Sequence, residues 1–122
     1  MALRALFDSN ILIDYLNGVN AAHAELRRYQ QPAISIVSWI EVLVGALAGE
    51  EAVTRKFLAT FEHIGVTPKI ADRAVTLRRL DRMRVPDAII LATAQTENIL
   101  LVTRDTKEFS SDLPGIRIPY NL

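Results

Sequence analysis

Residues 7–16 of the sequence read FDSNILIDYL, and the fold depends on how this stretch is interpreted. Residues 2–7, which lead into it, form a short and mostly apolar segment, and such a segment predicts a buried β-strand. The residues after the aspartate carry apolar side chains at the spacing of one helix face: Ile11, Leu12, Tyr15 and Leu16. Asp8 therefore lies at the turn between a first strand and a first helix. In open α/β sheets, ligands bind at the carboxyl ends of strands, so a carboxylate at this turn is a candidate site residue.

The 122 residues are half hydrophobic and show no linker, repeat or low-complexity segment, which predicts a single domain spanning residues 1–122. Lys plus Arg equals Asp plus Glu at 14 each, which argues against nucleic-acid binding through bulk positive charge alone. The chain has no cysteine, which excludes disulfides, a thiolate nucleophile and a cysteine-based zinc site. It shows no signal-peptide pattern and no apolar stretch of membrane-spanning length, so we expect a cytoplasmic protein without a membrane partner.

Short apolar runs alternate with helical patterns along the rest of the chain. The runs predict further strands at residues 33–37, 64–66, 99–103 and 116–118. The helical patterns cover residues 21–29, 38–49, 50–62, 67–83 and 87–97. Strands that alternate with helices predict an α/β fold with a three-layer α/β/α arrangement, in which helices cover both faces of a central parallel sheet of four to five strands.

Local signals indicate the helix boundaries in the second half of the chain. Thr67 suits an N-cap, and Pro68 suits the first turn that follows it. Val85–Pro86 is expected to end that helix, because proline does not continue a helix that precedes it. The helix expected at residues 87–97 is unusually apolar, which predicts burial on most of its sides.

Four acidic residues fall at junctions between these elements: Asp8, Glu41, Asp87 and Asp105. Each of them, taken alone, has an ordinary structural explanation. Asp8 would cap a turn, and Asp105 with Glu108 would cap a short helix that follows. Ser38 and Glu41 have the spacing of a capping box in the first turn of a helix. Asp87 follows a proline in a first helical turn, where a negative charge suits the positive end of the helix.

Taken together, the four acids suggest a metal site. The ends of parallel strands and the helix starts beside them lie along one edge of the sheet, where several carboxylates repel one another strongly. Such a cluster is stable with a cation or with raised protonation. Oxygen ligands without cysteine or histidine suit Mg²⁺ or Mn²⁺, and Mg²⁺ at carboxylates is typical of phosphate chemistry. Ser9, Asn10 and Thr103 add short polar groups that can orient the acids or bound water.

Four segments in this order resemble the PIN-domain ribonucleases, and most of all the VapC toxins of bacterial toxin–antitoxin pairs. The segments are DSNILI at residues 8–13, Glu41, VPDAIILATA at residues 85–94 and LVTRD at residues 101–105. The resemblance covers nearly the whole chain and implies a PIN-domain-like fold. It also implies endonucleolytic cleavage of RNA with Mg²⁺ or Mn²⁺, a homodimer, and inhibition by a cognate VapB-like antitoxin.

The resemblance assigns roles to individual residues of this sequence. The acids of the family fall on Asp8, Glu41, Asp87 and Asp105, and its hydroxyl residue falls on Thr103. Many relatives have threonine where this chain has serine at position 9, a difference that keeps the hydroxyl. The family mechanism implies that the first three acids bind the metal directly, whereas the fourth binds a second metal or acts through another ligand.

Basic residues near these positions are candidates for contacting the phosphates of an RNA. Arg104 stands beside Asp105, and Arg82 is one of five arginines between Arg73 and Arg84. A solvated helix face explains the five arginines equally well.

Two other functions stay open from the residues alone. A receiver-like phosphoryl-transfer protein would use Asp8 as phosphate acceptor and would need a lysine after a late strand. The lysines of this chain are Lys56, Lys69 and Lys107, and none follows an expected strand at the required place. A non-catalytic α/β binding module would use the four acids only as helix caps. A divalent-metal titration separates that module from the enzyme, because caps alone do not bind Mn²⁺ tightly.

Overall fold

The central sheet is parallel throughout, as the alternation of strands and helices predicts. The computed structural model describes residues 4–110 and 112–122, and within them the sheet has five strands in the order β3-β2-β1-β4-β5. The strands are β1 (Arg4–Phe7), β2 (Gln31–Ser35), β3 (Glu62–Ile64), β4 (Leu100–Val102) and β5 (Ile116–Arg117). The helices are α1 (Ser9–Leu16), α2 (Asn20–Leu26), α3 (Ile36–Val44), the 3-10 helix η1 (Ala48–Glu50), α4 (Glu51–Leu58), α5 (Pro68–Asp81) and α6 (Val85–Glu97).

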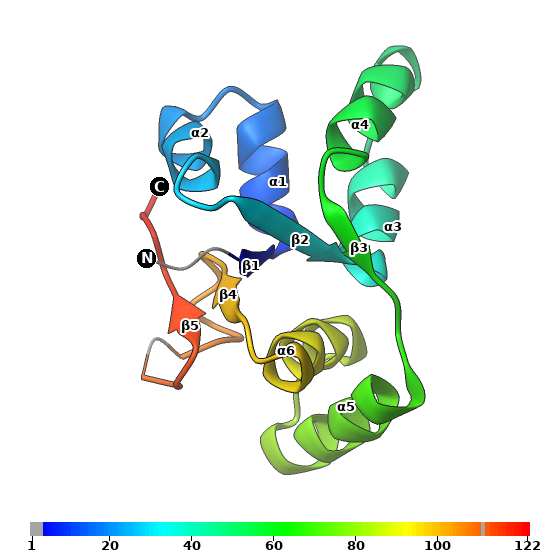
Figure 1. Ribbon diagram of the computed structural model, residues 1–122, viewed down its shortest axis with the longest axis vertical. Helices are drawn as coiled ribbons and strands as arrows, with labels where there is room; N and C mark the ends of the chain where they lie inside the picture. The colour runs from blue at the N-terminus through cyan, green and yellow to red at the C-terminus, as the bar shows by residue number, and fades with distance from the viewer. Residues whose placement is uncertain (1–3, 111) are drawn as a thin grey trace.

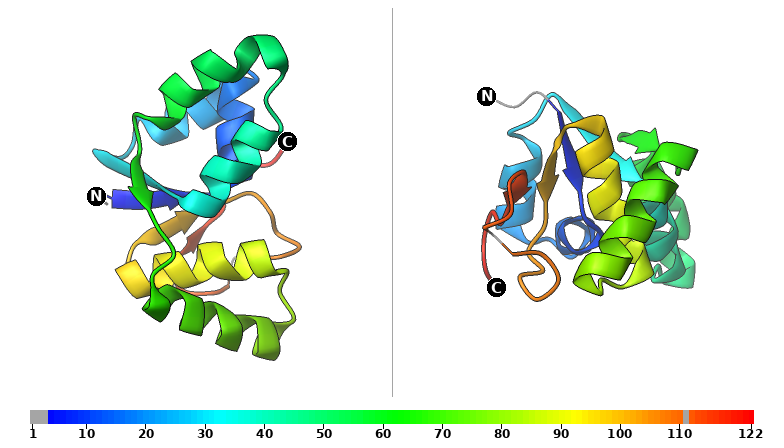
Figure 2. Two further views of the ribbon diagram at one scale, coloured as in Figure 1. Left: turned by 90° about the vertical axis from the view of Figure 1, so that its right-hand side faces the viewer. Right: turned by 90° about the horizontal axis from the view of Figure 1, so that it is seen from below.

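Helices cover both faces of the sheet, which confirms the three-layer α/β/α prediction (Figure 1 and Figure 2). On one face, α1, α2 and α4 enclose a core that contains Phe7, Ile11 and Leu58. On the other face, α5 and α6 enclose a second core that contains Leu6 and Ile70. Leu6 and Phe7 are neighbours in β1 and point to opposite faces, as the pleat of a strand requires. Helix α3 packs against both α1 and α6, so it joins the two helical layers.

Helix α6 lies between the sheet and α5 (Figure 1). Its buried residues are Asp87, Ala88, Ile90, Leu91, Ala92, Thr93 and Ala94. This confirms the burial that its apolar composition predicts. None of the helices in the described part of the chain combines the length and the apolarity of a membrane-spanning segment.

The second strand and the helix after it both begin earlier than predicted. Strand β2 runs from Gln31 to Ser35, whereas the predicted strand covers residues 33–37. Helix α3 begins at Ile36 because Ser35 is its N-cap. The Ser35 hydroxyl accepts a hydrogen bond from the Val37 backbone N–H at 3.1 Å, which turns the chain into a helix directly after the strand.

The predicted capping box between Ser38 and Glu41 is wrong for the same reason. Both residues lie inside α3, and Glu41 is in the second turn of the helix rather than the first. A side chain beyond the first turn cannot reach the free N–H groups at the helix start. The helix is also shorter than predicted, because it ends at Val44 with Gly45 as its C-cap.

The stretch predicted as one helix at residues 50–62 contains three elements. Helix α4 ends at Leu58, and the third strand, β3, is shifted two residues toward the N-terminus from the predicted 64–66. Among the described strands, β3 pairs only with β2, from Ala33 to Ser35 of that strand. Because β2 ends there, the chain after β3 has no strand to pair with.

The boundary between α5 and α6 differs from its prediction in one respect. Thr67 is the N-cap of α5 as predicted, accepting a hydrogen bond from the Ile70 backbone N–H at 3.2 Å. The helix ends at Arg82, whose left-handed backbone (φ 56°) reverses the chain. Val85 and Pro86 then form the first turn of α6, where the missing N–H of proline costs nothing. The other predicted elements are present, with ends that differ by a few residues. Residues 2 and 3 of the first predicted strand lie outside the described residues.

Candidate functional site

The ends of two adjacent strands bring Asp8 and Thr103 together. Phe7 of β1 pairs with Val102 of β4, and the Asp8 backbone N–H donates to the Val102 carbonyl at 2.9 Å. The residue that follows β4, Thr103, donates its hydroxyl to Asp8 Oδ2 at 2.8 Å. Strand β1 is also the point from which the strand order runs in both directions, with β2 on one side and β4 on the other. Open α/β sheets bind ligands at such a point.

Asp8 caps α1 as well as facing the strand ends. Its Oδ1 accepts from the Ser9 backbone N–H at 2.7 Å, so the structural explanation of this residue is correct in itself. Its Oδ2 accepts from the Asn10 side-chain amide at 3.3 Å, and the same amide nitrogen lies 3.2 Å from Thr103 Oγ1. Capping does not exclude a site, because the carboxylate is held in place by donors from two separate strand ends.

The pKa of the Asp8 carboxyl is raised by burial and by neighbouring acids. Only 4% of the residue is exposed, and burial raises its pKa to about 6. Hydrogen bonds from Thr103 and Ser9 act in the opposite direction, whereas the charges of Glu41 and Asp105 raise the pKa further. The structure therefore brings these two acids within electrostatic range of Asp8, as the sequence predicts.

Glu41 reaches the site from α3. Its Oε1 accepts a hydrogen bond of 2.7 Å from the Ser9 hydroxyl, which ties α3 to the start of α1. One helical turn earlier, Ser38 is fully buried, and within the described residues its hydroxyl has no hydrogen-bond partner. This side of the site thus contains a buried polar group without a protein partner.

Asp87 enters the site from the first turn of α6, where the sequence places it. It is 8% exposed, and burial raises its pKa to about 6, with the charge of Asp8 as the next cause. Glu108 and Asp105 also raise this pKa, whereas Arg84, 3.3 Å away in an ion pair, lowers it. The raised pKa values of Asp8 and Asp87 have the same two causes: burial first, and then the negative charges of neighbouring acids.

Sequence reasoning assigned no site role to Glu108, although its charge acts on Asp87. Its Oε1 accepts from the Arg84 backbone N–H at 2.9 Å, at the start of α6. Asp105, in turn, accepts from the backbone N–H groups of Lys107 and Glu108, both at 3.1 Å. It is a cap as predicted, but the segment that it caps is a turn and not the predicted short helix. The spacing of Asp105 and Glu108 was the one signal for Glu108, and it indicated a cap.

Of the two arginines that are candidates for binding phosphate, Arg104 pairs with an acid of α1, whereas Arg82 is exposed. Arg104 turns its guanidinium toward Asp14 of α1, with Nη2 donating to Asp14 Oδ1 at 2.8 Å. Arg82 is exposed at the end of α5, and within the described residues it makes no ion pair or side-chain hydrogen bond with the four acids. A role of either arginine in binding RNA stays a prediction.

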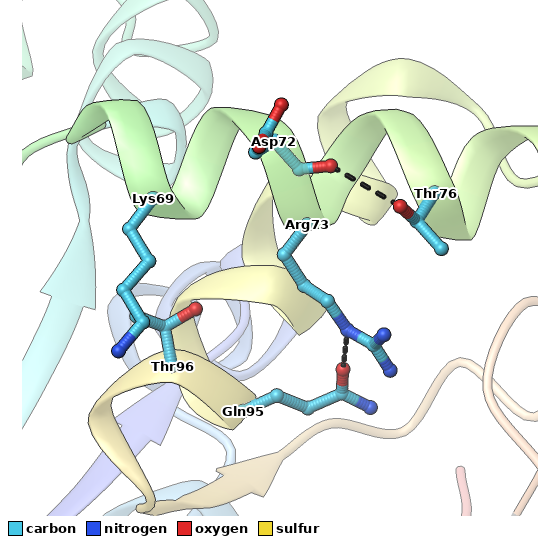
Figure 3. Close-up of a pocket in the computed structure, with 6 residues that line it drawn as sticks. All are labelled: Lys69, Asp72, Arg73, Thr76, Gln95 and Thr96. Atoms are coloured by element: carbon cyan, nitrogen blue, oxygen red, sulfur yellow. Dashed lines mark hydrogen bonds between the residues drawn. The ribbon is translucent and has the colours of Figure 1, made fainter.

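A polar pocket of about 550 Å³ lies at the other end of α5 and α6. It is lined by Lys69, Asp72, Arg73, Thr76, Gln95 and Thr96, and Arg73 donates to the Gln95 side chain at 2.7 Å (Figure 3). Gln95 is in the last turn of α6, whereas Asp87 is in the first turn. Arg73 therefore stands one helix length away from the acids and is not part of their site.

The acids suit a hard divalent cation by their chemistry. Within residues 4–110 and 112–122, no three acidic or histidine side chains stand close enough to hold one ion as they are. The donors nevertheless are all carboxylate oxygens, which Mg²⁺ and Mn²⁺ prefer. Two of the acids, Asp8 and Asp87, are buried and have raised pKa values. A nearby cation would lower these pKa values again.

Known proteins resemble this chain over most of its length. The model of the PIN domain family matches residues 5–111. "Ribonuclease VapC10" of Mycobacterium tuberculosis H37Rv is 34% identical over 112 residues, which cover 85% of this chain and 84% of that protein. A toxin–antitoxin complex from Klebsiella pneumoniae is 46% identical, with a TM-score of 0.91 and a match that covers 97% of this chain and 99% of the other. FitAcB from Neisseria gonorrhoeae, at 19% identity and a TM-score of 0.81 over 97% of this chain and 99% of its own, shares the fold.

We predict that Asp8→Asn stabilises the metal-free protein at neutral and higher pH. A raised pKa means that the Asp8 carboxyl favours folding below its ordinary value of 3.8 and that this contribution is lost as the pH rises through about 6. Asparagine removes the charge and keeps the cap, so the free energy of unfolding should increase by roughly 1–3 kcal/mol at pH values above that range. Urea unfolding in EDTA across the acid-to-neutral range measures the difference.

The control is Asp112→Asn, which removes an exposed aspartate. This variant should show no gain that grows with pH. An Asp8→Asn protein that is less stable than the wild type at every pH would contradict the electrostatic account of the site.

Proposed function

Because this chain belongs to the PIN-domain family, we propose that it is a metal-dependent endoribonuclease, the toxin of a VapBC-type toxin–antitoxin system. The observation that carries this proposal is the pair of buried carboxylates, Asp8 and Asp87, which come from different layers and whose pKa values are each raised to about 6. The likeness to the Klebsiella toxin–antitoxin complex, at 46% identity over nearly the whole chain, supports the toxin role.

Asp8, Glu41 and Asp87 are the residues that would hold the metal, with Asp105 beside them. When bound, Mg²⁺ or Mn²⁺ supplies a Lewis acid for the scissile phosphate and lowers the pKa of water, which makes water a nucleophile near neutral pH. The neighbours of the acids fix their positions: Thr103 and Asn10 donate to Asp8, and Ser9 donates to Glu41. Oriented ligands of this kind reduce the reorganisation that metal binding requires.

The two competing functions are less well supported than the ribonuclease. A receiver-like protein needs a lysine beside the Asp8 carboxylate, and within the described residues no lysine side chain hydrogen-bonds to Asp8. A binding module with acids as caps accounts for Asp8 and Asp105. It does not account for Glu41, which lies in the second turn of α3 and accepts from Ser9 of another helix.

We further propose an RNA substrate and a VapB-like antitoxin as partners. The first follows from the ribonuclease name of the Mycobacterium relative, and the second from the Klebsiella complex. A single domain over residues 1–122 and a homodimer also stay proposals. Exposed apolar side chains at one-turn spacing on α3 and just after it, Ile40, Val44 and Leu47, offer a surface for self-association.

We predict that Glu41→Gln lowers RNA cleavage by at least about 100-fold without lowering stability, because glutamine loses the charge that a hard cation prefers. The substitution does not remove a helix cap, because the N-cap of α3 is Ser35 and Glu41 takes no part in capping. The assay is cleavage of total RNA in Mn²⁺, together with thermal unfolding. Glu51→Gln, an exposed acid on α4, is the matched control and should cleave normally.

Asp8→Asn serves in the same assay as the inactive reference. A Glu41→Gln protein with a normal rate and normal Mn²⁺ dependence would remove Glu41 from the metal site. Normal cleavage by both variants would remove the site altogether.

We predict a homodimer in sedimentation-velocity experiments at micromolar concentration. Val44 is 81% exposed at the centre of the apolar surface, so Val44→Glu should shift the protein toward a monomer and leave its circular dichroism unchanged. A wild type that sediments as a monomer would contradict the dimer and would leave the catalytic proposal untouched.

A further inference from the structure

Asp14 is a buried carboxylate beside the acidic site that the proposed mechanism does not use. It lies on α1 and is 4% exposed. Its two oxygens accept hydrogen bonds from the Arg104 guanidinium, with the Nη2–Oδ1 distance at 2.8 Å, and Tyr120 donates its hydroxyl to Oδ2, also at 2.8 Å. Three parts of the chain that are far apart in sequence therefore meet at one charge.

Arg104 connects Asp14 to the metal site through its own backbone. The Arg104 backbone N–H donates to Asn10 Oδ1 at 3.2 Å. The amide nitrogen of the same Asn10 side chain donates to Asp8 and to Thr103. The residue before Arg104 is Thr103, which donates its hydroxyl to Asp8. The residue after it is Asp105, whose backbone N–H donates to Thr103 Oγ1.

We propose that Asp14 and Tyr120 are positioning residues that set the affinity of the acidic site for its divalent cation. By holding the Arg104 side chain against α1, Asp14 fixes the segment that carries Thr103 and Asp105. This inference rests on the proposed function, because it concerns the cation of that same site. Partners one step removed from the ligands commonly change metal affinity by 10- to 100-fold.

Tyr120 completes the arrangement, since it joins the last residues of the chain to Asp14. Its hydroxyl is the only contact to Asp14 in the described residues that comes from beyond β5. Without the Tyr120 hydroxyl, Asp14 still accepts hydrogen bonds from Arg104, but its Oδ2 is held by one donor fewer. The arginine and the segment attached to it can then reorient, which is expected to weaken cation binding without breaking the fold.

The chain contains a second arrangement of similar composition, which provides the control. It differs by a further ion pair, 3.7 Å long, between Glu25 and Arg28. Glu25 of α2 is also 4% exposed, and it accepts from Arg117 of β5 at 2.7 and 3.0 Å. Tyr29 donates to Glu25 Oε2 at 2.9 Å. The two arrangements share a buried carboxylate, an arginine bound by two hydrogen bonds and a tyrosine hydroxyl. In the described residues, Glu25 makes no hydrogen bond with any residue of the acidic site.

The experiment compares Tyr120→Phe with Tyr29→Phe, because each removes one hydroxyl from one buried carboxylate. Free Mn²⁺ is measured by electron paramagnetic resonance during titration of each metal-free protein, and thermal unfolding is measured in EDTA. We expect both variants to lose a similar amount of stability. Tyr120→Phe should bind Mn²⁺ about 3- to 10-fold more weakly than the wild type, whereas Tyr29→Phe should bind like the wild type.

Two further variants separate the possible outcomes. Asp8→Asn should abolish binding and thereby shows that the titration reports the acidic site. Arg104→Ala should weaken Mn²⁺ binding as Tyr120→Phe does. If it instead raises the KM for RNA and leaves Mn²⁺ affinity unchanged, Arg104 acts on phosphate and the positioning role is overturned.

The failure of this inference can be told from the failure of the proposed function. A wild type that binds Mn²⁺ and an Asp8→Asn protein that does not, with Tyr120→Phe equal to Tyr29→Phe, would overturn the positioning role alone. A wild type that binds no Mn²⁺ would overturn both.

Discussion

The burial of the Asp8 charge at the end of β1 is the constraint on which the rest of the site depends. The carboxylate is 4% exposed, and a buried charge is costly unless hydrogen bonds or an opposite charge compensate it. The structure supplies hydrogen bonds from Ser9, Asn10 and Thr103. Within the described part of the chain, no basic side chain pairs with Asp8, and the nearby acids add to the cost. The raised pKa of Asp8, about 6, is the result of this incomplete compensation.

The topology of the sheet explains how so many negative charges come to one edge. Because all described strands are parallel, β1 and β4 end on the same edge, where α1, α3 and α6 also begin. Asp8 and Asp87 stand at the starts of α1 and α6, and Glu41 stands in the second turn of α3. Helix α3 packs on both α1 and α6 and so joins the two helical layers. A fold of this kind gains nothing in stability from such a cluster. Packing does not offset this repulsion, whereas the divalent cation that we propose for the site would.

The sequence predicts those parts of the molecule that follow from local pattern and strand direction. The meeting of Asp8 with Thr103 follows from two strand ends on one edge, and the burial of α6 follows from its composition. Competition between similar local signals is harder to predict: Ser35 and Ser38 both suit an N-cap, and the structure uses the first. Contacts between distant segments leave no local pattern at all. The pairing of Asp14 with Arg104, 90 residues apart, is of this kind.

The most direct test of the account is calorimetric titration of Mn²⁺ into the metal-free protein, in two buffers that differ in ionisation enthalpy. A cation that takes the place of protons on Asp8 and Asp87, whose pKa values are about 6, must release protons when it binds near that pH. The account predicts proton release at about pH 6 that disappears by about pH 8, where both carboxyls are already ionised. Binding without proton release at the lower pH, or no binding at either, would contradict it.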